Sequence, residues 1–254
     1  MSPVSRELFL AGAGVVAGLV GTAGGITSLV SYPALLLAGV APLQANIANL
    51  VAVVACWPGS AVVSQPELRG RGPWLLRWSA VAAVGGTVGS LLLLNTSAGV
   101  FGRVVPFLVA AGSLALLFQP WLAARPAWQD DAGRSKALLL PAGLLVLSVY
   151  NGYFGAGSGV LLLALLLLTT DPHLATANAM KNMVVGAATI ASAILFAVLT
   201  SVDWAAVAAL GAGLFVGSLI GPGVARHLPP SVLRWLVALT GLGLAIRLWL
   251  DPAG

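Results

Sequence analysis

The chain has 254 residues, of which 59% are hydrophobic and 7% are charged. A soluble domain carries roughly 25% charged residues, so 12 Lys and Arg and 7 Asp and Glu side chains are too few to coat a soluble globule of this size. The composition also excludes a disordered chain. The net charge of +5 comes from basic residues scattered singly, which argues against a nucleic-acid partner. These features predict an all-α polytopic membrane protein.

Eight apolar stretches follow one another, most of them near the roughly 20 residues that a helix needs to cross a bilayer. The first and fifth are longer, and each contains a Gly-rich break at which we expect the segment to be broken or re-entrant. A Pro-rich and charged stretch, 120–137, is predicted to be a linker between two four-segment repeats, 1–119 and 138–254. The stretches are about 8–38, 46–64, 74–95, 100–119, 138–169, 178–200, 203–222 and 232–250.

The two halves carry similar motifs in the same order and at a nearly constant offset along the chain. Such duplication is a common plan of transporters. The alternative is chance similarity between helices rich in Gly and Ala. The matched pairs are Ala23-Gly24-Gly25 with Ala156-Gly157-Ser158-Gly159, Ala45-Asn46 with Ala177-Asn178, Gly89-Ser90-Leu91 with Gly217-Ser218-Leu219, and Arg103 and Gly112 with Arg234 and Gly243.

The orientation in the membrane follows from the basic residues, which gather on the cytoplasmic side. If all eight segments cross once, the twelve Lys and Arg divide eight against four; if segments one and five re-enter, they divide nine against three and the halves become inverted. Both arrangements place the 120–137 linker in the cytoplasm.

The positions of small and aromatic residues indicate where helices pack closely and where segments end. Gly85 and Gly89, like Gly213, Gly217 and Gly221, recur every fourth position, which allows close helix packing in lipid. The lone cysteine is expected to be a small apolar filler. Several Trp, including Trp57, Trp74, Trp121, Trp204, Trp235 and Trp249, lie near segment ends and are interpreted as interfacial anchors.

The Gly-rich breaks are the first candidates for a binding site. They contain Gly24 and Gly25 in the first half, and Gly157, Ser158 and Gly159 in the second. Unpaired backbone N–H groups at membrane depth are costly unless they line a cavity or face protein. Transporters use such breaks to direct helix N-termini at anions. The alternative is close packing through glycine alone.

A cluster of amides around one cation is the second candidate. Asn178, Lys181 and Asn182 share one helix face, and the matched site in the first half has Asn46 and Asn49. A charge inside an apolar helix is a functional candidate, and we expect a nearby helix start to reinforce its attraction for anions. The alternatives are a lysine that snorkels to the interface and asparagines that join helices.

The groups that an enzyme needs are missing from the apolar segments. His173 and His227 fall in loops without metal-ligand spacing, and Asp171-Pro172-His173 is predicted to be a turn and helix start. No serine-nucleophile or ATP-binding motif is present. We expect no catalysis, no metal and no cofactor.

The stretch Tyr150-Asn151-Gly152-Tyr153-Phe154-Gly155-Ala156-Gly157-Ser158-Gly159, followed by Ala175-Thr176-Ala177-Asn178-Ala179-Met180-Lys181-Asn182, resembles the TauE/SafE sulfite-exporter family. Gly24-Gly25 and Pro33 resemble the family's pattern in the first half. The resemblance covers nearly the whole chain and implies an inner-membrane permease for sulfite, sulfonates or related anions. Two residues depart from the pattern: Asn151 replaces an Asp and Ala156 replaces a Pro. The loss of the Asp carboxylate puts in doubt any coupling of transport to a proton or cation that this carboxylate would supply.

The sequence therefore predicts a multi-pass secondary transporter of the cell inner membrane. Its partners are a small anion, the bilayer and a coupling proton or cation, and a homo-oligomer is compatible with the sequence. A passive anion channel and a non-transporting scaffold stay open as alternatives. The predicted substrate-binding residues are Gly24, Gly25, Asn46, Asn49, Gly157, Ser158, Gly159, Asn178, Lys181 and Asn182.

Overall fold

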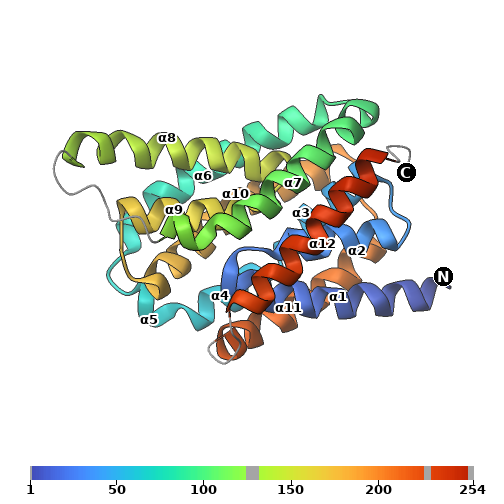
Figure 1. Ribbon diagram of the computed structural model, residues 1–254, viewed down its shortest axis with the longest axis horizontal. Helices are drawn as coiled ribbons and strands as arrows, with labels where there is room; N and C mark the ends of the chain where they lie inside the picture. The colour runs from blue at the N-terminus through green and yellow to red at the C-terminus, as the bar shows by residue number, and fades with distance from the viewer. Residues whose placement is uncertain (1, 124–131, 226–229, 251–254) are drawn as a thin grey trace.

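A computed structural model describes residues 2–123, 132–225 and 230–250. All regular structure within these ranges is helical, as predicted (Figure 1). The helices are α1 (Pro3–Gly24), α2 (Thr27–Leu37), α3 (Pro42–Val53), α4 (Cys56–Val63), α5 (Gln65–Leu68), α6 (Gly72–Leu94), α7 (Ala98–Ala123), α8 (Ala132–Tyr153), α9 (Ser158–Thr169), α10 (Leu174–Leu199), α11 (Trp204–Ala225) and α12 (Pro230–Leu250).

The lengths and composition of the helices are those of a multi-pass membrane protein. Among the described residues, five stretches are long and apolar enough to cross a bilayer: Pro3–Thr22, Pro42–Val63, Gly72–Leu94, Ala98–Phe118 and Leu174–Leu199. Shorter apolar helices lie beside them. Many large hydrophobic side chains are exposed on the outside of the bundle, among them Leu76 and Val198 at 77% and 75%, as expected where lipid replaces water.

The first and fifth apolar segments are each interrupted. The first divides into α1 and α2, and α2 packs back against α1; the fifth divides into α8 and α9, which pack together in the same way (Figure 1). Both interruptions fall at the predicted Gly-rich motifs.

The second segment also divides, which the sequence analysis did not anticipate. Pro58 lacks an N–H group and cannot donate to the Val54 carbonyl four residues earlier. Trp57 N donates to Val54 O over 3.0 Å instead, and Ala55 N to Ala52 O over 3.0 Å, so the chain tightens into a three-residue turn between α3 and α4.

The linker predicted at 120–137 is helical at both ends. α7 continues to Ala123 and α8 begins at Ala132, and 124–131 lie outside the described residues.

Glycines allow two pairs of helices to touch along their backbones. On α11, a Cβ added to Gly217 would lie 2.2 Å from the Val15 carbonyl oxygen of α1. On α6, a Cβ added to Gly89 would lie 2.0 Å from the Val149 carbonyl oxygen of α8. Backbones approach this closely only where side chains are absent, so these glycines have the predicted packing role.

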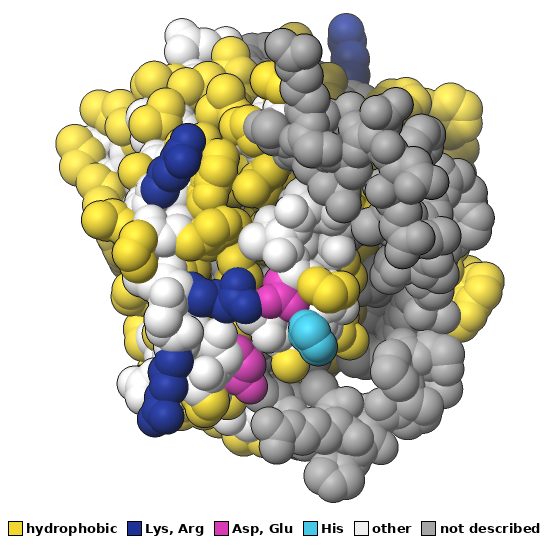
Figure 2. Space-filling model, turned by 90° about the vertical axis from the view of Figure 1, so that its left-hand side faces the viewer, with side chains coloured by type: hydrophobic (Ala, Val, Ile, Leu, Met, Phe, Trp, Pro, Cys, Tyr) yellow, Lys and Arg dark blue, Asp and Glu magenta, His cyan; other side chains and the backbone are white. Residues whose placement is uncertain are grey.

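Two ion pairs join helix starts that are far apart in the sequence. Arg6 at the start of α1 lies 2.6 Å from Asp203 before α11, and Arg71 before α6 pairs with Asp171 before α10. Asp171 also accepts the His173 N–H at 2.9 Å, and His173 is the N-cap residue of α10, as the predicted turn implies. Figure 2 views the end of the molecule where basic, acidic and His side chains meet.

Gly217→Ala is expected to destabilise the protein by about 1–3 kcal/mol, because the new methyl group must displace the α1 backbone. Gly211→Ala on the same helix is the matched control, since its nearest neighbour would be 3.8 Å away. Thermal unfolding of the purified variants in detergent measures the stability of each. Equal unfolding temperatures for the two variants would contradict the close packing of α1 on α11.

Stability is expected to fall in acid through Asp171. The His173 N–H, supported by Arg71, holds the pKa of this carboxyl below its usual value against the opposing effect of burial. Because the pKa is lower in the folded state than in the unfolded state, the ionised carboxylate stabilises the fold above about pH 4. This stabilisation is lost as the pH falls through the folded-state pKa. Asp171→Asn should unfold at a lower temperature at pH 7 and change less between pH 7 and pH 3. Glu7→Gln, an exposed carboxylate on α1, should behave as wild type; an unchanged acid response in Asp171→Asn would contradict this role.

Candidate functional site

The two helix breaks meet at the centre of the bundle. Gly25, at the end of α1, and Gly157, just before α9, have φ angles of 76° and 79°, a conformation that favours glycine. A Cβ added to Gly25 would lie 2.7 Å from the carbonyl carbon of Gly159. The backbones of the first and second halves are therefore in direct contact where both helices are interrupted.

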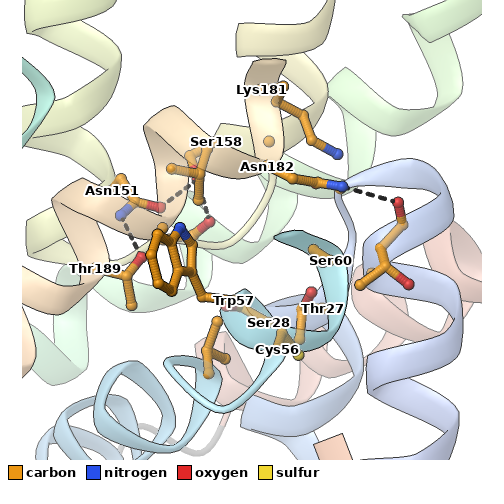
Figure 3. Close-up of a pocket in the computed structure, with 18 of the residues that line it drawn as sticks. Thr27, Ser28, Cys56, Trp57, Ser60, Asn151, Ser158, Lys181, Asn182 and Thr189 are labelled. Atoms are coloured by element: carbon orange, nitrogen blue, oxygen red, sulfur yellow. Dashed lines mark hydrogen bonds between the residues drawn. The ribbon is translucent and has the colours of Figure 1, made fainter. Parts of the chain in front are cut away.

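A cavity of about 70 Å³ lies at this contact (Figure 3). Its walls come from the α1–α2 break, α3, α4, the α8–α9 break and α10. A water molecule takes up about 30 Å³ of liquid, so the space suits a small polyatomic ion or a few waters. Its polar side chains are those of Thr22, Thr27, Ser28, Ser60, Asn151, Ser158, Lys181, Asn182 and Thr189.

Two helix N-termini open onto the cavity. Thr27 begins α2 and Ser158 begins α9, and both residues line the space. The preceding residues, Ile26 and Gly157, provide no side-chain cap. Some first-turn N–H groups already bind local carbonyls, as Ser158 N does with Gly155 O and Leu29 N with Ile26 O. The positive ends of two helix dipoles nevertheless lie beside the same small volume, an arrangement that attracts anions.

Lys181 brings a basic side chain to this cavity. Its side chain is 1% exposed, so it does not snorkel to the interface. Nζ donates to Asn178 Oδ1 over 2.7 Å, and within the described residues no carboxylate pairs with it. A buried ammonium without a counter-ion is costly and attracts a negative ligand. The expected help from a helix start is not found, because α10 begins at Leu174, two turns earlier, and the dipole effect is confined to the first turn.

Asparagine side chains donate hydrogen bonds to backbone carbonyls at the ends of the interrupted helices. Asn178 and Asn182 Nδ2 donate to the Thr22 carbonyl near the end of α1, over 3.0 and 3.4 Å. Asn46 Nδ2 donates to the Tyr153 carbonyl at the end of α8 over 2.8 Å. These carbonyls lack helical partners and carry the negative end of the dipole. The amides reduce that negative field beside the cavity.

A hydroxyl and amide network forms another wall. Ser158 Oγ lies 2.7 Å from both Asn151 Oδ1 and the Gly155 carbonyl, and Asn151 Nδ2 donates to Thr189 Oγ1 over 3.0 Å (Figure 3). The network joins the end of α8, the start of α9 and the middle of α10. It fixes the α9 N-terminus relative to Lys181.

The structure brings half of the predicted site residues to the cavity and places the others nearby. Gly25, Ser158, Gly159, Lys181 and Asn182 line it. Asn46, Asn49, Gly157 and Asn178 do not: Asn46 and Asn178 bind helix ends, Asn49 contacts Ser31, and Gly157 packs on Gly112. Gly24 is the last residue of α1, next to Gly25.

Several lining residues were missed from the sequence. Trp57 and Thr189 stand at the offset that relates Asn46 to Asn178, but their side chains are unlike, so the repeat gave no signal for either. Ser60 has an identical counterpart, Ser192, at that offset, so extending the repeat match would have marked it. Ser28 carried no such signal, because isolated serines are common in membrane helices.

Trp57, predicted to be an interfacial anchor, also lines the cavity. Its indole lies six residues before the end of the Pro42–Val63 stretch and packs against Gly186, where an added Cβ would lie 1.8 Å from the indole Cδ1. At 38% exposure it is the most exposed of the bulky lining side chains. The turn imposed by Pro58 directs it there, and the indole covers the cavity on that side.

The fold and the site define a multi-pass membrane protein with interrupted helices around a buried polar cavity that is lined by one lysine. Within the described residues no cluster of His, Cys, Asp or Glu could hold a metal. The family model of the sulfite exporter TauE/SafE matches residues 8–248, and the chain belongs to this family of membrane transporters.

Two curated relatives agree with this assignment. The chain is 25% identical over 247 residues to a probable membrane transporter protein of Haemophilus influenzae, covering 94% of this chain and 92% of the relative. It is also 25% identical over 249 residues to the probable membrane transporter protein ORF9 of a Sinorhizobium species, covering 96% and 92%. No solved structure matches the chain.

Cys56 allows the cavity to be probed directly, because it is the single cysteine of the chain and lines the cavity beside Trp57. A small methanethiosulfonate reagent should label the wild-type thiol slowly, since Cys56 is 8% exposed. Trp57→Ala should accelerate labelling about tenfold or more by uncovering the thiol, and Trp249→Ala, an exposed Trp elsewhere, should leave the rate unchanged. Labelling followed by mass spectrometry measures this; equal rates in all three proteins would refute the covering role of Trp57.

Proposed function

We propose that this protein is a secondary transporter of the inner membrane that moves a small anion, such as sulfite, a sulfonate or a related organic anion, by alternating access. The observation that carries the proposal is the buried ammonium group of Lys181, which lies in a cavity between two helix N-termini without a carboxylate partner among the described residues. An anion would compensate this charge.

The donors around the cavity suit the oxygens of a small anion. Backbone N–H groups at the starts of α2 and α9 provide directional donors, as do the amide of Asn182 and the hydroxyls of Thr27, Ser28 and Ser60. Hydrogen bonds from charged or dipolar donors to oxyanions are shorter and stronger than neutral ones. The anion-binding roles predicted for Asn46, Asn49 and Asn178 would then be indirect, through the helices they position.

The packing supports two inverted repeats, 1–119 and 138–254. α1 packs on α11, and its counterpart α8 packs on α6, the counterpart of α11; α2 meets α12, as α9 meets α7. Exchanging the halves therefore reproduces the same contacts. Both termini lie at one end of the molecule and α8 begins at the other (Figure 1), so we place α1–α2 and α8–α9 as re-entrant hairpins from opposite sides.

This placement corresponds to the nine-against-three division of basic residues, with the linker in the cytoplasm. The cavity is built from both halves. Because α1 packs on α11 and α6 on α8, each moving bundle would contain helices of both halves, and movement of one bundle against the other would open the cavity to each side in turn.

Lys181→Met is expected to abolish saturable anion uptake into proteoliposomes while raising the unfolding temperature in the absence of substrate. Removing an unpaired buried charge relieves its desolvation cost. If the lysine had a purely structural role, its replacement would lower both stability and uptake. Arg103→Met, which removes an exposed charge from α7, is the control and should match wild type.

Uptake is measured with sulfite, sulfoacetate and sulfate, with and without ion gradients. Saturable flux that a gradient accelerates would support a carrier, whereas non-saturating flux without counterflow would indicate an anion channel. Full uptake by Lys181→Met would contradict the charge role, and no flux of any anion in wild type would favour a scaffold.

A further inference from the structure

The side of α10 that lines the cavity changes from polar to apolar along the helix. Lys181 and Asn182 carry the basic and amide groups, and the next turn presents Val185 and Gly186 to the same cavity. One helical turn rises about 5.4 Å. An anion held beside Lys181 therefore lies about one turn away from the apolar part of the wall.

The indole of Trp57 fills the space beside this apolar turn. A Cβ added to Gly186 would lie 1.8 Å from the indole Cδ1 and 2.5 Å from Nε1, so the ring occupies the position that a side chain of residue 186 would take. Figure 3 shows the indole extending from α4 into the space among the polar side chains. Val53 and Val185, four residues before Trp57 and one before Gly186, line the cavity and are apolar as well.

The cavity is too small for an organic group while the indole is in place. Its volume is about 70 Å³, whereas an engineered protein cavity that binds benzene has about 150 Å³. The contact of Gly25 with Gly159 forms another part of the wall, and no side chain there could move aside to enlarge the space. The Trp57 side chain is therefore the part of the wall that limits the size of a bound anion.

We propose that Trp57 determines which anions this transporter accepts, and that its indole restricts the site to compact oxyanions such as sulfite and methanesulfonate. The inference rests on the proposed function and narrows its substrate class. A substituent that points along α10 away from Lys181 meets the indole within about one turn. Sulfonates with an aromatic ring are then excluded by a steric clash, which is a common source of specificity.

Removal of the indole should leave a space that suits an aromatic ring. Its walls would be Val53, Val185 and the bare backbone at Gly186, and apolar cavities of this kind bind benzene. Trp57→Ala should therefore admit benzenesulfonate, with the sulfonate beside Lys181 and the ring in the place of the indole. Sulfoacetate should stay excluded, because apolar walls offer its carboxylate no hydrogen bonds.

Competition against sulfite uptake measures this selectivity. Proteoliposomes with the full-length protein take up radioactive sulfite in the presence of methanesulfonate, benzenesulfonate or sulfoacetate, and the half-inhibiting concentrations are compared. In wild type, benzenesulfonate should be at least about tenfold weaker than methanesulfonate, since one surplus methylene group can cost this factor. Equal competition by the two sulfonates in wild type would overturn the proposal.

In Trp57→Ala, the half-inhibiting concentration of benzenesulfonate should fall by about tenfold or more, and that of sulfoacetate should not change. Trp204→Ala, which removes an exposed Trp at the start of α11, is the matched control and should keep the wild-type selectivity. Wild-type selectivity in Trp57→Ala would also overturn the proposal.

Two further variants separate size selection from a loss of structure. Gly186→Leu in the Trp57→Ala background places a side chain where the indole was, and should exclude benzenesulfonate again. Trp57→Leu keeps part of the volume and should give an intermediate selectivity, so the test does not depend on the Ala variant alone. A double variant that accepts benzenesulfonate as well as Trp57→Ala does would refute selection through the space that the indole fills.

Thermal unfolding of the purified protein with each anion separates this proposal from the proposed function. Saturable sulfite uptake that all three competitors inhibit equally would leave the transporter intact and refute the size limit. Stabilisation by sulfite and methanesulfonate but not by benzenesulfonate, in a protein that moves no anion, would support the size limit and refute transport. Neither stabilisation nor uptake with any of these anions would refute both.

Discussion

Backbone polar groups inside a bilayer must find partners within the protein, and this constraint determines how the two interrupted segments are arranged. Neither break could face lipid, since its free N–H and carbonyl groups would have no water to bind. The structure places the breaks against each other, with Gly25 touching Gly159. Any side chain at this contact would separate the halves, so the cavity exists because both positions are glycine.

The same constraint gives the cavity its positive field. Interrupting a helix creates both a C-terminal end, with free carbonyls, and a new N-terminal end, with free N–H groups. Asn46 and Asn178 bind carbonyls at the C-terminal ends, whereas the starts of α2 and α9 have no side-chain caps. The carbonyls are thus partly satisfied, and the positive ends of α2 and α9 lie beside the cavity together with the basic side chain of Lys181.

Glycines also allow close packing between helices away from the two breaks. Where α1 meets α11 and α6 meets α8, glycines let backbones touch, and lipid supplies no hydrophobic force that would hold looser contacts together. Both of these contacts join a helix of the first half to a helix of the second, so the two halves interlock around the polar cavity. Trp57, held at the turn before Pro58, covers the cavity from one side.

The sequence by itself determined the class of protein, the limits of most apolar segments and the two helix breaks, because hydrophobic length and glycine runs act locally. It also identified Lys181, since a cation within an apolar stretch stands out without any structure. Only the tertiary structure decided which polar residues share the cavity. Asn46 and Asn178 face helix ends, while Asn151, Thr189 and Trp57 reach the cavity. Such choices depend on helix rotation and on a turn caused by one proline, and neither is encoded in residue spacing.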